Sequence, residues 1–160
     1  MILIKLLLGI SFLLIFFQDN KNREVYWFLF PLVAVFCGIL FYVNTLFVLF
    51  LNALVLNCLF VLILIIIIGL YSKLKLKTSI LKTIGLGDIL LFFALAFSFS
   101  TIAFVIFFIS ALIFSLGLHV YRTKNMTQNT TVPLAGYMSL FFLMAYTTHW
   151  LGFVNMLYKI

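Results

Sequence analysis

Two uncharged apolar stretches of this chain are longer than a membrane is thick, and they constrain its fold more than any other feature. The first runs from Val25 to Leu70 and would be about 69 Å long as one helix at roughly 1.5 Å per residue. The second runs from Ile89 to Val120 and would be about 48 Å long. Because a bilayer core is about 30 Å thick, the first stretch must fold back on itself.

The composition excludes the soluble classes of protein. Charged residues make up 8% of the 160 residues and hydrophobic residues 67%, whereas a soluble domain carries about 25% charged residues. So few charges cannot cover the surface of a soluble globular domain. Aromatic residues at 19% exclude a disordered chain. The sequence therefore predicts an all-α, polytopic membrane protein that forms a single domain over residues 1–160.

Polar residues mark the places where the apolar stretches turn. Asn44-Thr45 divides the first stretch, and the segment from Ser98 to Thr101 marks a turn in the second. The run near the N-terminus resembles a signal peptide, but no small-x-small cleavage site follows it, so we expect a retained span. Pro133 opens the last span, since a helix start tolerates proline. The six predicted transmembrane helices cover residues 2–17, 25–43, 46–70, 89–100, 101–120 and 133–157.

The basic residues sit in short gaps between these spans, which indicates membrane topology rather than nucleic-acid binding. Lys5 and Lys159 lie at the termini, and the remaining eight lie in alternate gaps. The positive-inside rule therefore predicts both termini outside and the basic loops in the cytoplasm. In one loop, the alternation from Lys73 to Lys77 indicates a strand-like or interfacial stretch. The eight basic residues are Lys21, Arg23, Lys73, Lys75, Lys77, Lys82, Arg122 and Lys124.

The chain contains two aspartates, Asp19 and Asp88, and one glutamate, Glu24. Asp19 follows the first predicted span and Asp88 precedes the fourth, so both carboxylates should lie at a similar depth, where ionisable groups usually face a cavity or a partner. Two carboxylates that share one proton can act as general base toward water and general acid toward a carbonyl. This chemistry needs no metal and no cofactor, and Cys37 and Cys58 offer no paired metal-ligand spacing.

Each aspartate also has a purely structural interpretation. Asp19 would be an interfacial charge beside Lys21 and Arg23, and Asp88 would be the N-cap of the helix that follows it. The segment Gly85-Leu86-Gly87-Asp88 favours chemistry instead, because glycines allow a substrate backbone to come close. Since Asp88 lies at a helix N-terminus and Asp19 at a helix C-terminus, we expect Asp88 to ionise more readily.

These motifs resemble those of the type IV prepilin peptidase family and, more broadly, of membrane aspartyl proteases with a Gly-x-Gly-Asp motif. In that family the first aspartate begins a segment of the form Asp-x-x-x-x-x-(Ile/Val)-Pro, which Asp19 to Val25 matches with Tyr26 in place of the proline. Residues 85–88 match the second motif, with Leu90 where the family often has lysine. Val132-Pro133-Leu134-Ala135-Gly136 is similar to the proline-containing segment that opens the family's last helix.

The resemblance implies a membrane-embedded aspartyl endopeptidase in which Asp19 and Asp88 are catalytic, while Gly85, Gly87 and Pro133 serve substrate approach. The substrate would be a leader-bearing prepilin or pseudopilin precursor in the plasma (inner) membrane, cleaved at the cytoplasmic face. Larger family members add a cytoplasmic domain with paired Cys-x-x-Cys motifs, so this short form is expected to lack methyltransferase activity. The alternative is a non-catalytic membrane scaffold subunit or small transporter, including an inactive relative of the family. The sequence specifies neither the natural substrate nor the oligomeric state.

Overall fold

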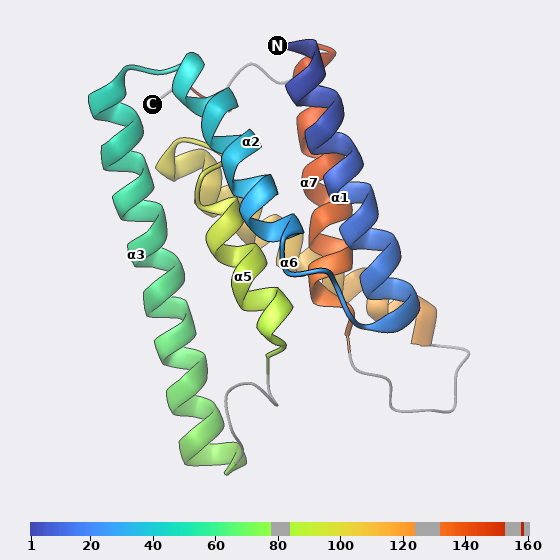
Figure 1. Ribbon diagram of the computed structural model, residues 1–160. Helices are drawn as coiled ribbons and strands as arrows, with labels where there is room; N and C mark the ends of the chain where they lie inside the picture. The colour runs from blue at the N-terminus through green and yellow to red at the C-terminus, as the bar shows by residue number, and fades with distance from the viewer. Residues whose placement is uncertain (78–83, 124–131, 153–157, 159–160) are drawn as a thin grey trace.

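The computed structural model describes residues 1–77, 84–123, 132–152 and 158, and the regular secondary structure within these ranges is entirely helical (Figure 1). The predicted all-α fold is therefore confirmed. Among the described residues, α1, α3 with its η1 extension, and α6 are long and apolar enough to cross a membrane. The elements are α1 (Ile2–Asn22), α2 (Leu29–Val43), α3 (Phe47–Tyr71), the π-helical turn η1 (Ser72–Leu76), α5 (Leu86–Leu95), α6 (Thr101–Thr123) and α7 (Leu134–Trp150).

The predicted turns lie where the sequence placed them. Helix α2 ends at Val43 and α3 begins at Phe47, and the side-chain amide of Asn44 donates to the Leu40 carbonyl at 2.7 Å. That bond occupies a carbonyl near the end of α2. The break between α5 and α6 covers residues 96–100, and Pro133 directly precedes α7, as predicted.

Other expectations need correction. Lys73 to Leu76 is not strand-like, because Ser72–Leu76 continues α3 as a helical turn that ends where Lys77 adopts a left-handed φ of 52°. A continuing helix bonds its own amides, whereas a lone strand leaves them without partners. Helix α2 begins four residues later than the predicted span. The ten residues of α5 extend about 15 Å, half of a bilayer core. Lys82, Lys124 and the end of the last predicted span lie outside the described residues.

The helices pack around α7. Helix α1 packs along α7 and α2, α6 packs along α7, and α2 packs on α5, while α3 stands to one side (Figure 1). A buried aromatic cluster joins α1 and α7 to the turn after α5, where the ring centroids of Phe99 and Tyr146 lie 5.0 Å apart. Asn57 links α3 to that turn, because its side-chain amide donates to the carbonyls of Ala96 and Phe99, each at 3.0 Å.

Much of the apolar surface faces outward. On α3 the exposed side chains include Ile63, Ile66 and Ile67, and on α6 they include Ile106 and Ile113. Soluble monomers rarely expose continuous apolar patches of this kind. Since α3 buries few of its side chains inside the protein, its outer surface is suited to contact with lipid.

Four helix ends meet at one end of the bundle. Asp88 in the first turn of α5 accepts a hydrogen bond from Ala135 in the first turn of α7. Arg122, near the end of α6, donates to Asn20 in the last turn of α1. The start of α5 and the end of α6 therefore lie at the same end of the molecule, so the stretch from Ile89 to Val120 folds back as a hairpin. This end of the bundle carries both aspartates.

Candidate functional site

Asp19 lies in the last turn of α1 and is only 9% exposed. The helix ends after Asn22 because Arg23 adopts a left-handed conformation with φ 59°, which turns the chain away toward α2. The Asp19 carboxylate faces α7, where its Oδ2 accepts a hydrogen bond of 2.6 Å from the Gly136 amide. A Cβ atom at position 136 would lie 3.0 Å from that oxygen and 3.1 Å from the Asp19 Cβ. Only glycine allows the two helices to come this close.

Asp88 lies in the first turn of α5. The helix starts at Leu86 with Gly85 as its N-cap, so in the structural interpretation Asp88 is not the N-cap but the third residue of the helix, where its side chain completes a capping box. The reason is that the Gly85 carbonyl already accepts the first helical hydrogen bonds, from the amides of residues 88 and 89. The Asp88 carboxylate reaches back instead, and its Oδ2 accepts a 3.2 Å bond from the Gly85 amide. Its Oδ1 accepts a 2.8 Å bond from the Ala135 amide.

The two carboxylates therefore meet at consecutive backbone amides in the first turn of α7. The Cα atoms of consecutive residues are about 3.8 Å apart, so bonds to Ala135 and Gly136 hold Asp19 and Asp88 beside each other. Burial and the negative charge of Asp19 raise the pKa of Asp88 to about 6, although the amides of Ala135 and Gly85 favour its charged form. This is the behaviour of two acids that influence each other's protonation.

Both carboxylates open onto one cavity of about 310 Å³. Gly85 and Gly87 line it, as does Ala135, while Pro133 lies outside the lining and starts α7 instead. A Cβ at Gly87 would lie 3.4 Å from the Phe30 ring, and a Cβ at Gly85 would lie 3.3 Å from Asp88 Oδ2. Arg23 and Glu24 add one charge of each sign to the wall.

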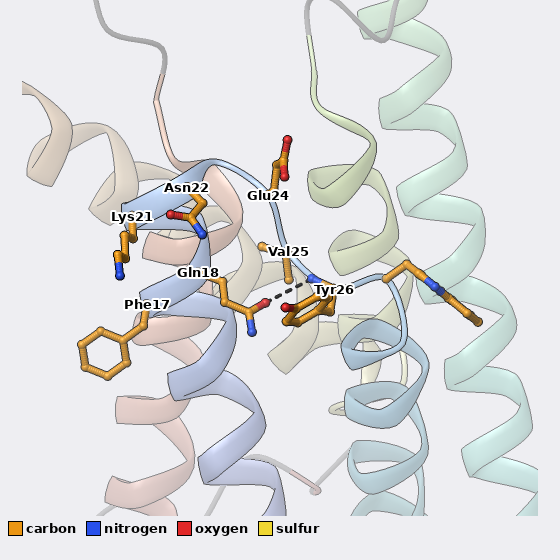
Figure 2. A pocket seen from close by; sticks show the side chains of 8 residues that line it. Phe17, Gln18, Lys21, Asn22, Glu24, Val25 and Tyr26 are labelled. Carbon is orange, nitrogen blue, oxygen red and sulfur yellow. Dashed lines mark hydrogen bonds between the residues drawn. The ribbon is translucent and has the colours of Figure 1, made fainter.

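A second groove, of about 500 Å³, runs beside this cavity on the outer side of α1. Figure 2 shows the labelled side chains projecting from the last turns of α1 and from the connection to α2. The Gln18 side chain accepts a 3.1 Å hydrogen bond from the Tyr26 amide, which fixes this connection against α1 (Figure 2). Glu24, Val25 and Trp27 line both spaces, so the cavity and the groove share a wall.

The structure thus brings together four of the five residues singled out in the sequence, Asp19, Asp88, Gly85 and Gly87. The amides of Ala135 and Gly136 were not singled out as carboxylate donors, because a main-chain donor has no signature in residue type. The tight position of Gly136 had one signal, its place in the segment that begins at Val132. Within the described residues, no group of three or more His, Cys, Asp or Glu side chains gathers to hold a metal ion.

Comparison of the chain with protein-family models, with curated proteins and with solved structures finds no match. What the chain can do is therefore inferred from the geometry of its site. That geometry has three parts, namely a pair of adjoining carboxylates, the cavity they line, and two glycines in the wall of that cavity.

Proposed function

We propose that this chain is a membrane aspartyl endopeptidase whose catalytic residues are Asp19 and Asp88. The observation that carries the proposal is the convergence of the two carboxylates on adjacent amides of α7, from helices that are far apart in the sequence. The whole chain contains three acidic residues, and two of them take part. With so few acids, such a meeting is uncommon by chance. A cavity lined by both carboxylates gives a peptide and a water molecule a place to react.

The proposed reaction is hydrolysis by an activated water. The ionised carboxylate takes a proton from water as the water oxygen attacks the scissile carbonyl carbon, and the protonated carboxyl gives its proton to the carbonyl oxygen. Collapse of the tetrahedral intermediate breaks the C–N bond, and the amine leaves with a proton from the dyad. We assign the ionised role to Asp19 and the protonated role to Asp88, because burial and the negative charge of Asp19 raise the pKa of Asp88 to about 6. This is the reverse of the assignment expected from the helix termini.

The proposed substrate is a leader-bearing membrane precursor of the prepilin or pseudopilin type, cleaved at the cytoplasmic face of the plasma membrane. Lys21, Arg23 and Arg122 lie at the same end of the bundle as the dyad, and basic residues concentrate on the cytoplasmic side of membrane proteins. This supports a six-span topology with both termini outside. In that topology the short helix α5 begins at the cytoplasmic face and reaches about half-way into the bilayer core.

One observation favours a second candidate function, a non-catalytic membrane subunit. Both oxygens of Asp88 and one oxygen of Asp19 accept main-chain amide hydrogen bonds. Carboxylates in the first turn of a helix satisfy amides that have no partner within the helix. In this second function the pair would fasten α1 and α5 to α7, and no substrate would be cleaved.

Co-expression with candidate precursors distinguishes the two functions. We expect the wild-type chain to release a leader, detected as a loss of mass in the precursor, and Asp19→Asn and Asp88→Asn each to abolish that loss while still inserting into the membrane. Glu24→Gln is the matched control, because it removes an acid from the same cavity wall without touching the dyad. Full processing by either aspartate variant would refute the catalytic assignment.

A further inference from the structure

Arg122 lies near the end of α6. It contacts α1, which carries Asp19, and α7, which donates a hydrogen bond to Asp19. Its Nη1 donates to the Asn20 side-chain oxygen at 3.1 Å and lies 3.4 Å from the Tyr137 hydroxyl. Its guanidinium carbon stands 5.7 Å from the centroid of the Tyr137 ring. One side chain of α6 therefore holds the last turn of α1 and the first turn of α7 together.

The two residues that Arg122 contacts are next in the chain to Asp19 and Gly136, which are joined by a hydrogen bond. Asn20 follows Asp19, and Tyr137 follows Gly136, whose amide donates to Asp19. The contacts form a closed ring that runs from Asp19 through Gly136, Tyr137, Arg122 and Asn20 back to Asp19. Arg122 and the bond between Asp19 and Gly136 therefore connect the same two helices, α1 and α7. Arg122 does so at the surface, and the bond between Asp19 and Gly136 does so in the interior.

The last turn of α1 has a reason to need such support. Arg23, in the left-handed conformation, ends the helix four residues after Asp19, and the final carbonyls of a helix have no partner within it, so helix ends fray. Fraying of this turn would move Asp19 relative to Asp88. A guanidinium is suited to hold it, because its donors are fixed in one plane and it stacks on aromatic rings.

We infer that Arg122 is a positioning residue that fixes Asp19 in register with Asp88 by clamping α1 to α7 at the dyad end. The effect on cleavage rests on the proposed function, whereas the clamp itself belongs to the fold. Arg122 is exposed, so its loss leaves the packed core intact. What its loss changes is the local order of two helix turns.

The chain supplies a matched control at the other end of the same helix pair. The Lys5 ammonium of α1 lies 5.6 Å from the centroid of the Trp150 ring at the end of α7. Lys5→Gln therefore removes a cation–π contact between α1 and α7 without touching the dyad. Arg122→Gln and Arg122→Lys complete the set, and the lysine variant keeps the charge but loses the planar donors.

Hydrogen–deuterium exchange of the peptide containing Gly136 tests the clamp without any substrate. We expect Arg122→Gln to speed its exchange by about five- to tenfold, Arg122→Lys to give an intermediate rate, and Lys5→Gln to leave it unchanged. Unchanged exchange in Arg122→Gln would overturn the inference. Faster exchange across all helices would overturn it too, because that is a loss of overall stability.

Cleavage kinetics test the consequence for chemistry. If Arg122 positions Asp19, Arg122→Gln lowers kcat by about tenfold with KM unchanged, and Arg122→Lys restores part of the rate. A rise in KM alone would contradict a positioning role. If the wild-type chain cleaves no precursor, the proposed peptidase function fails, and the exchange measurement still decides whether Arg122 clamps the two helices.

Discussion

Replacing Gly136 with alanine tests whether the close approach of α1 and α7 sets the position of Asp19. The added Cβ would lie 3.0 Å from Asp19 Oδ2, 3.1 Å from Asp19 Cβ and 3.4 Å from the Phe16 carbonyl oxygen. Carbon atoms pack at about 3.5–4.0 Å, so the methyl group is several tenths of an ångström too close. Rotating the Asp19 side chain relieves only the contact with Oδ2, because Cβ and the carbonyl oxygen are fixed to the backbone.

The cost of this substitution has two parts. Forcing α1 and α7 apart is overpacking, which costs about 1–3 kcal/mol of unfolding free energy. The movement also lengthens the 2.6 Å hydrogen bond between the Gly136 amide and Asp19, and bonds to charged groups contribute about 1.5–3 kcal/mol. If the dyad is catalytic, a displacement approaching 1 Å lowers the cleavage rate by up to about 100-fold.

Two other glycines provide matched controls on the same scaffold. Gly9 lies on α1 facing α7, and a Cβ there would meet Leu143 at an ordinary 3.6 Å, while a Cβ at Gly117 would meet nothing within 4 Å. Both alanine variants should match or exceed the wild-type stability, since alanine favours helix by about 1 kcal/mol. Thermal unfolding in detergent and precursor cleavage are measured for all three. Wild-type stability in Gly136→Ala would refute the packing argument, and lowered stability with undiminished cleavage would refute the role of Asp19 placement in catalysis.

Three further outcomes are expected. Cleavage should fall about tenfold per pH unit above about pH 6, because burial and the charge of Asp19 raise the pKa of Asp88 to about 6, and above that pH Asp88 loses the proton that it gives to the scissile carbonyl. A flat rate from about pH 5 to 8 would contradict this. Asn57→Ala should lower the unfolding free energy by about 1–3 kcal/mol, since it strips two buried carbonyls of a donor, whereas the exposed Asn52→Ala should change it by less than about 0.5 kcal/mol; equal losses in urea titrations would argue against the buried link. Gly87→Ala should slow cleavage less than Gly136→Ala, because its methyl meets only the edge of the Phe30 ring at 3.4 Å, and a larger effect on kcat would show that the ring cannot yield.

The sequence predicted those parts of the fold that local chemistry decides. Asn44 marks a turn because its amide bonds a helix-terminal carbonyl, and Pro133 precedes a helix because proline fits a helix start. The prediction that Lys73 to Lys77 is strand-like was wrong. Alternation indicates a strand only where a partner strand exists, and here α3 continues as a helical turn. The expected pairing of Asp19 with Asp88 rested on similar membrane depth. In the structure, two amides of α7 bring the carboxylates together. These contacts join residues that are up to 117 positions apart in the sequence, which local patterns do not reveal.

The donors to both carboxylates belong to the main chain, and this determines which genetic changes can remove them. Exchanging the methyl of Ala135 for another side chain leaves its N–H in place. Ordinary side-chain substitutions at position 135 therefore do not remove the hydrogen bond to Asp88. Proline is the exception, because it has no N–H and the first turn of a helix accepts it. Position 135 is the second residue of α7. Ala135→Pro would therefore remove the N–H that donates to Asp88 while keeping the helix.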